Sequence, residues 1–75
     1  MELISGKLYK TNTTFLVMDL DNVILRGDVL MFVKERYIPR YDSYITTVLC
    51  NKGIFNIRHI SKNYIKGNLY KLWPN

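Results

Sequence analysis

Residues 29–35 read Val-Leu-Met-Phe-Val-Lys-Glu, and their pattern is the strongest structural signal in the chain. The opening apolar run contains β-branched and aromatic residues, which favours a β-strand that is buried on both faces, or on one face with a partner covering the other. The turn Arg26-Gly27-Asp28 comes directly before it, and Gly27 can take the positive φ that a sharp bend requires. A buried strand that leaves a tight turn, in a chain of 75 residues, indicates a small β-protein.

Short strands separated by turn residues continue on both sides of this stretch. The predicted strands are residues 7–10, 14–20, 23–25, 29–35, 44–50, 54–60 and 68–73. The predicted connections are a polar loop at 36–43 around Pro39, a hairpin turn at Asn51-Lys52-Gly53, and one helical turn at residues 61–64 that Ser61 can cap. No stretch keeps a helical period of 3.6 residues, so the fold class is all-β.

The length predicts one domain, residues 1–75, with a small core. A closed sheet would remove the exposed strand edges of such a small protein, which favours a barrel. Alternation predicts a core of Leu8, Leu30, Phe32, Val48, Ile60, Ile65 and Leu69, with Val23, Ile45 and Leu49 beside it. Cys50 is the single cysteine, which excludes an intramolecular disulfide, and we interpret it as a small apolar strand residue.

Three segments resemble, in order, the landmarks of SH3-type barrels. Lys7–Thr11 resembles the ALYDY motif of the first strand, Leu25–Leu30 resembles the turn that opens the second strand, and Ile60–Ile65 resembles the IPSNYV turn before the last strand. The resemblance implies a small five-stranded SH3-like barrel with one short 3-10 turn before the last strand. It also implies an aromatic groove for proline-rich peptides, in which Tyr9 and Tyr64 would lie.

Several positions differ from the SH3 pattern and favour another ligand. Thr11 stands at the second tyrosine of the first motif, and His59 and Ser61 stand at a tyrosine and a proline of the last motif. Tyr44 is nearest to the tryptophan that usually starts the third strand. SH3-like barrels of prokaryotes and phages often bind nucleic acids or dock on proteins. The frequent Asn, Lys, Ile and Tyr indicate an AT-rich genome, as in small accessory proteins of T4-like phages.

The formal net charge of +5 lies entirely in residues 43–75. That half contains no acid, and its bases are Lys52, Arg58, Lys62, Lys66 and Lys71, with His59 beside them. A field of one sign attracts a polyanion or an acidic protein surface. On an SH3-like barrel these segments are neighbours, which predicts one basic face. The alternative is ordinary solubilising surface.

Aromatic and basic residues alternate around Pro39. The set consists of Arg36, Tyr37, Arg40, Tyr41 and Tyr44. This composition suits single-stranded nucleic acid, because the rings stack on bases while the guanidinium groups contact phosphates. It equally suits a protein interface, or tyrosines that cover the end of the barrel.

The sequence contains no catalytic constellation and no phosphate-binding glycine loop. His59 is the only histidine, so a general base would lack a recognisable partner. Asp19 and Asp21 form a pair that could hold a divalent cation, but a solvated turn explains them equally. We therefore expect no enzyme activity, no metal and no cofactor.

The first hypothesis is a non-enzymatic module that binds RNA or single-stranded DNA, acting in phage host takeover or anti-defence. The second is a protein-interaction module that inhibits a host protein through the exposed edge of the second strand or the 37–44 loop. A homodimer could form through an outward row of Val29, Met31 and Val33. The N-terminus lacks the pattern of a signal peptide and no apolar run can span a bilayer, so we expect the cytoplasm of a bacterial host and no membrane contact.

Overall fold

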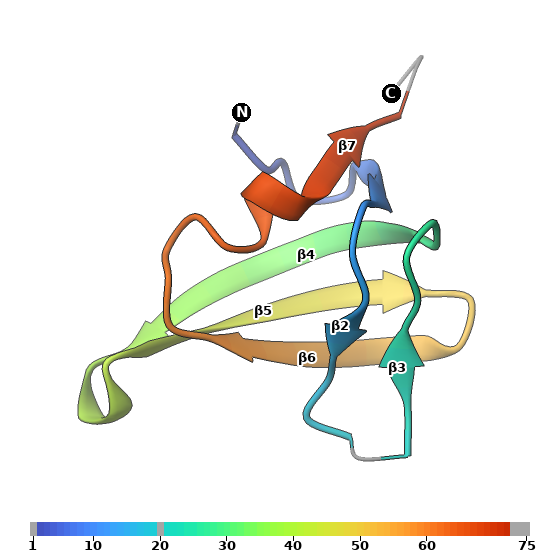
Figure 1. Ribbon diagram of the computed structural model, residues 1–75. Coiled ribbons are helices and arrows are strands. Elements are labelled where there is room, and N and C mark those ends of the chain that lie inside the picture. Colours follow the sequence, from blue (N-terminus) through green and yellow to red (C-terminus); the bar gives the residue numbers. More distant parts are fainter. Residues whose placement is uncertain (1, 20, 73–75) are drawn as a thin grey trace.

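The structure, a computed structural model, describes residues 2–19 and 21–72. The fold is mostly β and consists of a five-stranded antiparallel sheet, in the order β6-β5-β4-β1-β7, and a two-stranded hairpin, β2–β3 (Figure 1). The strands are β1 (Leu8–Thr11), β2 (Phe15–Leu16), β3 (Val23–Ile24), β4 (Val29–Ile38), β5 (Ser43–Cys50), β6 (Gly53–His59) and β7 (Leu69–Lys71). Two 3-10 helices, η1 (Pro39–Tyr41) and η2 (Lys66–Asn68), precede β5 and β7.

The hairpin lies across the sheet formed by β4, β5 and β6 (Figure 1), and the core lies between these two layers. The predicted closure of the barrel is wrong, because within the described residues the sheet ends at β6 and at β7. The hairpin segment covers part of one edge instead. The backbone N–H of Met18 donates to the carbonyl oxygen of Asn56 at 2.8 Å, on the edge of β6 that faces away from β5.

The core combines predicted and unpredicted residues. It consists of Tyr9, Phe15, Val17, Ile24, Leu30, Phe32, Val48, Phe55, Ile57, Ile65 and Leu69. Leu30, Phe32, Val48, Ile65 and Leu69 confirm the prediction, and Cys50 packs partly buried against the core as expected. Val23 and Ile45 are half-buried beside it.

Three core predictions are wrong. Leu8 and Leu49 are 40% and 39% exposed, because their neighbours Tyr9 and Val48 take the inward positions of the same strands. Ile60 is 82% exposed, because β6 ends at His59 and the chain turns away there.

The polar loop predicted at 36–43 is wrong as well. β4 continues through Ile38, β5 begins at Ser43, and Tyr37 pairs with Tyr44 across the ladder. The reversal uses η1 and Asp42, whose φ of 47° is left-handed. Residues 61–64 form a hydrogen-bonded turn, and the 3-10 turn lies later, at η2.

The predicted 14–20 strand is limited to Phe15–Leu16, and its last residue, Leu20, lies outside the described residues, as does Trp73 at the end of the last predicted strand. The turns at Gly27 and Gly53 are confirmed, with φ of 93° and 128°. Both angles lie in the region that favours glycine.

Cross-strand register divides the sheet into two faces, because directly paired residues share a face. The inner face carries the buried residues of β1, β4, β5 and β6 apart from Ser43, which is buried at the start of β5 and pairs with Ile38. A register shift between Phe32 and Lys34 changes which residues of β4 point inward. We define the outer face as Leu8, Lys10, Val29, Met31, Lys34, Arg36, Ile45, Thr47, Leu49, Ile54, Asn56 and Arg58. Among the described residues, no helix is long and apolar enough to cross a membrane.

Candidate nucleic-acid interface

The outer face carries cations from three strands. Arg36 pairs with Ile45, which pairs with Arg58, so the two guanidinium groups flank one strand. Lys34 lies in the next row, opposite Thr47. Lys10 of β1 lies nearer the other end, opposite Val29. All four cationic side chains are exposed.

No acid shares this face within the strands of the sheet. Glu35 is the only acidic residue in β1, β4, β5, β6 and β7, all of which the structure describes. It pairs with the buried Thr46 on the inner face. The outer face is therefore a surface of one charge sign.

Tyr41 extends the outer face at its basic end. The residue is 56% exposed. The guanidinium carbons of Arg58 and Arg40 lie 5.0 Å and 5.4 Å from the ring centroid, within the range of cation–π contacts. These contacts hold an exposed ring and two cations together.

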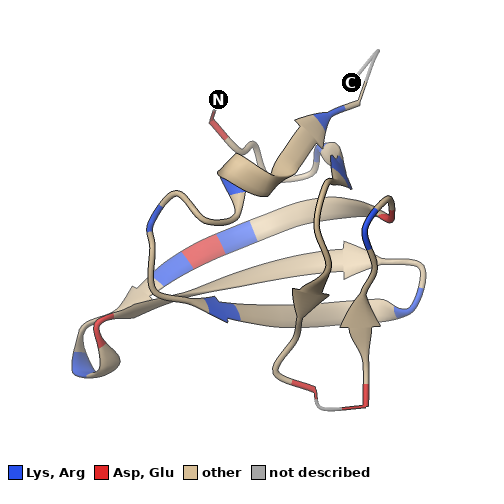
Figure 2. Cartoon of the chain, in the orientation of Figure 1, with Lys and Arg blue, Asp and Glu red and all other residues tan. Residues whose placement is uncertain are grey.

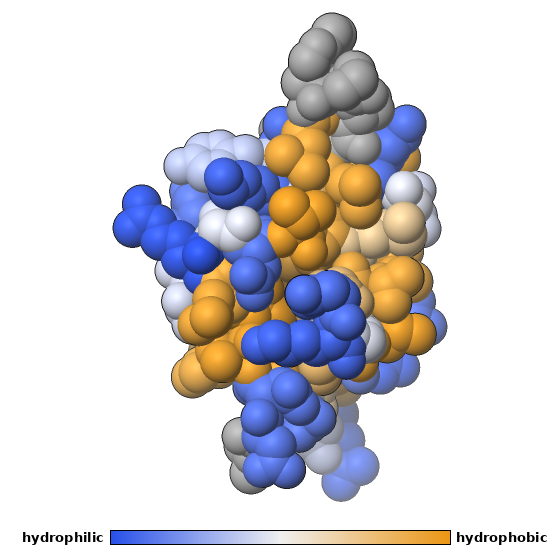
Figure 3. Space-filling view, turned by 90° about the vertical axis from the view of Figure 1, so that its right-hand side faces the viewer, coloured by the Kyte–Doolittle hydropathy of each residue, from blue (hydrophilic) through white to orange (hydrophobic). Residues whose placement is uncertain are grey.

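An apolar row crosses the outer face beside the cations. Leu8, Met31, Leu49 and Ile54 pair in succession across β1, β4, β5 and β6. Ile54 is 67% exposed. Figure 3 views the side of the molecule with the β5–β6 turn, where exposed hydrophobic side chains lie between hydrophilic ones. The outer face thus combines cations with apolar surface.

The six basic residues of the second half do not form the single face that the sequence predicted, and Figure 2 shows the lysines and the arginine among them on different elements. Arg58 is on the outer face, whereas Lys71 pairs with Tyr9 and so belongs to the opposite side of the sheet. The ammonium group of Lys52 lies 3.4 Å from the carbonyl oxygen of Val23, toward the hairpin. Lys62 and Lys66 line a pocket with Glu2 and Glu35.

His59 is not an exposed contact residue, which corrects its place in the predicted basic face. It is 6% exposed because its position on β6 points inward. Its Nδ1 lies 2.9 Å from the carbonyl oxygen of Ser61, which can only accept, so Nδ1 carries a proton. Its Nε2 lies 2.8 Å from Thr46 Oγ1 and 3.5 Å from Glu35 Oε1. These contacts commit both ring nitrogens to internal partners.

Tyr37 and Tyr44 belong to an aromatic row on the inner face. Tyr37 packs against Tyr44 at 5.1 Å, Tyr44 stacks on His59 at 5.6 Å, and Tyr64 follows at 6.0 Å from His59. Of the three predicted stacking tyrosines, Tyr41 has a cation–π contact with the outer-face residue Arg58. Tyr37 and Tyr44 instead lie on the inner side of the sheet.

Tyr37 is held by the turn that follows it. Its hydroxyl donates to Asp42 Oδ1 at 2.6 Å. This hydrogen bond, then partial desolvation and then the negative charge of Asp42, raise the pKa of Tyr37 above its ordinary value of 10.0.

A groove lies between β2 and the segment after β6, and it shares Arg58 with the outer face. It has a volume of about 530 Å³ and is lined by Thr14, Leu16, Ile57, Arg58, His59, Ile60, Ser61 and Tyr64. Tyr64 lines this groove and Tyr9 does not, so the two tyrosines do not share one groove. Tyr9 is 1% exposed, and its hydroxyl accepts a hydrogen bond from the backbone N–H of Ile4 at 2.9 Å.

The Asp19–Asp21 pair closes a turn. Asp19 Oδ1 accepts from the N–H of Asp21 at 3.0 Å, and Oδ2 accepts from Asn22 Nδ2 at 2.8 Å. Across residues 2–19 and 21–72, no group of three or more His, Cys, Asp or Glu side chains could hold a metal ion.

Sequence reasoning missed Lys10 and Lys34, since it weighed charge by position along the chain. A signal for Lys34 was present: in Lys34-Glu35-Arg36, strand alternation directs the two bases to one face and the acid to the other. No protein-family model, no curated protein and no solved structure matches this chain.

Proposed function

We propose that this protein is a non-enzymatic module that binds single-stranded nucleic acid, RNA or DNA, across the outer face of its sheet. The observation that supports the proposal is that the charged side chains of that face are all positive. Lys10, Lys34, Arg36 and Arg58 reach it from three strands, while the one acid of these strands points to the other side.

The chemistry of the face suits a single strand. Phosphates are bound by cations with release of counterions, which gives affinity without sequence readout. Bases can stack on the Tyr41 ring and on the guanidinium planes of Arg40 and Arg58 beside it. The apolar row of Leu8, Met31, Leu49 and Ile54 gives unstacked bases a surface away from water. The module acts by occupying the strand, and no residue is required to do chemistry.

The test compares two charge reversals that change the net charge equally. Arg36→Glu with Arg58→Glu alters the outer face, and Lys62→Glu with Lys66→Glu alters a site elsewhere. Each replacement removes two charges, so either pair takes the formal net charge from +5 to +1. Binding of a fluorescent oligouridylate is measured by anisotropy over a salt series.

We expect the outer-face variant to lose binding and the control variant to keep most of it. The slope of log K against log salt should fall by roughly 0.7 for each phosphate contact removed. Equal losses in the two variants would mean that net charge alone drives binding, and absence of binding by the unmodified protein at low salt would reject the proposal.

A second candidate function, docking on a protein, is favoured by the groove between β2 and the segment after β6. Leu16 and Ile60 line it with 79% and 82% of their surface exposed. Apolar side chains of this size, gathered at one groove, are typical of a site that a partner covers. Leu16→Ser with Ile60→Ser leaves the charge beside Arg58 unchanged, so it should abolish capture of such a partner and leave oligonucleotide binding intact.

We also propose that the strands have an SH3-like arrangement. It is supported by the positions of the three resembling segments. They fall at β1, at the turn into β4, and at the turn before η2 and β7.

A further inference from the structure

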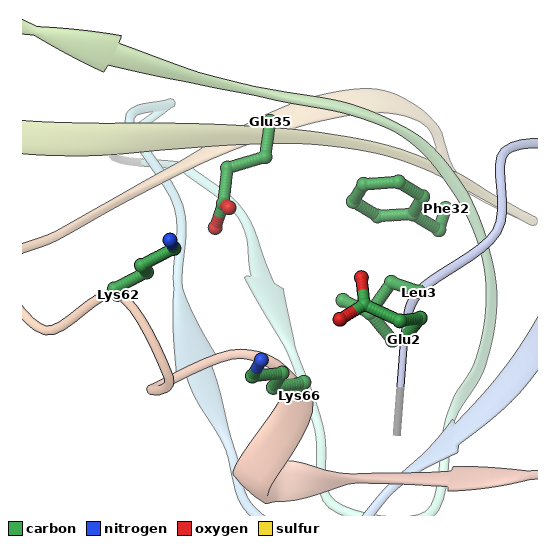
Figure 4. A pocket seen from close by; sticks show the side chains of 6 residues that line it. All are labelled: Glu2, Leu3, Phe32, Glu35, Lys62 and Lys66. Atoms are coloured by element: carbon green, nitrogen blue, oxygen red, sulfur yellow. The ribbon is translucent and has the colours of Figure 1, made fainter.

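A small pocket lies on the inner side of the sheet, away from the outer face. It has a volume of about 180 Å³ and lies between the N-terminal segment, β4 and the segment around η2. Its lining is Glu2, Leu3, Phe32, Glu35, Lys62 and Lys66 (Figure 4). Four of these six residues are charged, two of each sign, and their charged ends point into the same space (Figure 4).

Glu35 is the best-fixed charge in this pocket. Its Oε1 lies 3.3 Å from the hydroxyl of Thr46 and 3.5 Å from His59 Nε2. Both internal contacts use the same oxygen, and the side chain is 28% exposed. A carboxylate already held in place loses little conformational freedom when it binds a cation.

The lysines of the pocket are not neutralised by its carboxylates at close range. Within the described residues, the pairing of Glu35 with His59 is the one acid–base contact shorter than 4.0 Å. Lys62 and Lys66 come from the turn after β6 and from η2, whereas Glu35 comes from β4 and Glu2 from the N-terminal segment. The backbone thus brings two cations and two anions around one cavity.

The remaining lining is apolar. Phe32 belongs to the core and is 8% exposed, and Leu3 packs partly buried against that core. The volume lies below the range of about 300–1,000 Å³ typical of sites for drug-sized ligands, so the ligand must be small.

We propose that this pocket binds a free α-amino acid with an apolar side chain. The ammonium group of the ligand lies by Glu35 and Glu2, its carboxylate by Lys62 and Lys66, and its side chain against Phe32. A simple anion or a simple cation would satisfy one pair of charges and be repelled by the other, whereas a zwitterion satisfies both. The site shares no residue with the outer face and stands independently of the proposed nucleic-acid function.

The experiment titrates the ¹⁵N-labelled protein with leucine, N-acetylleucine and leucinamide, and follows backbone amide shifts by NMR. The two blocked compounds keep the side chain and lose one charge each. We expect leucine to give saturable shifts at Phe32, Glu35, Lys62 and Lys66. The two blocked compounds should bind at least about tenfold more weakly than leucine. Equal shifts with all three compounds, or no saturable shift with leucine, would overturn the proposal.

Two variants extend the test without disturbing the core. Lys66→Gln should weaken leucine about tenfold, because it removes a charge-assisted contact, and leave leucinamide unchanged. Lys71→Gln removes the same charge outside the pocket and should change neither compound. A loss of leucine binding in both variants would contradict the proposed site.

Discussion

Thr46 lies between His59 and Glu35 on the inner face. It is fully buried, and its hydroxyl lies 2.8 Å from His59 Nε2 and 3.3 Å from Glu35 Oε1. Thr46→Val keeps the shape of the side chain and removes its hydroxyl, so Nε2 of the buried His59 loses its hydrogen-bond donor. We expect the variant to lose about 1–3 kcal/mol of unfolding free energy in urea denaturation.

The neighbouring threonine is the matched control. Thr47 lies on the outer face, half-buried, and its hydroxyl donates to Asn56 Oδ1 at 2.6 Å. Because water can replace that bond, Thr47→Val should cost less than about 1 kcal/mol. If the two valine variants prove equally stable, the buried contacts of His59 do not stabilise the fold.

Tyr37 and Asp42 form the second pair to test at this scale. The hydrogen bond to Asp42 and its charge favour the neutral phenol, so the pKa of Tyr37 is raised. The stability that this pair contributes is therefore present below the ordinary value of 10.0 and is lost as the pH rises through the raised pKa.

Asp42→Asn should lower the pKa of Tyr37 toward its ordinary value, because the amide carries no negative charge. The measurement is the ultraviolet titration of tyrosinate, with Tyr37→Phe to assign the late-titrating ring. An unchanged titration curve in Asp42→Asn would show that the carboxylate does not control this phenol.

Among the elements, the β2–β3 hairpin depends most on a single side chain. Its strands pair only two residues each. Phe15 of β2 is fully buried and meets Tyr64 edge-on at 5.7 Å. Phe15→Ala should cost about 3–5 kcal/mol, a large part of the total stability of about 5–15 kcal/mol of a small domain.

Leu16 is the control for this substitution, since it is adjacent in the same strand and 79% exposed. Leu16→Ala should change the unfolding free energy by no more than about 0.5 kcal/mol. Comparable losses in the two variants, measured by urea denaturation, would mean that the hairpin does not rest on the Phe15 contact.

Element by element, the sequence predicted those strands that local pattern controls. β5 and β6 agree with the prediction to within a residue at each end, because the turn between them requires Gly53. The 36–43 segment failed because Pro39 was interpreted as the centre of a loop, whereas it begins η1 between two strands that pair up to Ile38 and Ser43. The assignment of Leu8 and Leu49 to the core was wrong because strand alternation defines two faces of a strand but does not determine which face is buried.

At the scale of the whole molecule, the prediction located the excess charge and missed its geometry. The region after residue 43 does contain five lysine and arginine residues and no acid. The turns at 51–53 and 61–68, however, direct several of these bases away from the outer face. Lys34 and Arg36 lie in the neutral half of the sequence and reach the same face as Arg58 because β5 separates their strands by one position. A count of charges along the sequence cannot show which bases share a face, because strand register is set by tertiary pairing.

The central claim is that a single strand of nucleic acid lies across the outer face. The most direct measurement is the change in the NMR amide shifts of the ¹⁵N-labelled protein when a short oligouridylate is added at low salt. Binding across the outer face predicts the largest changes at Lys34, Arg36, Tyr41 and Arg58, and their loss as salt rises. Changes confined to residues 62–71, or no changes at low salt, would contradict it.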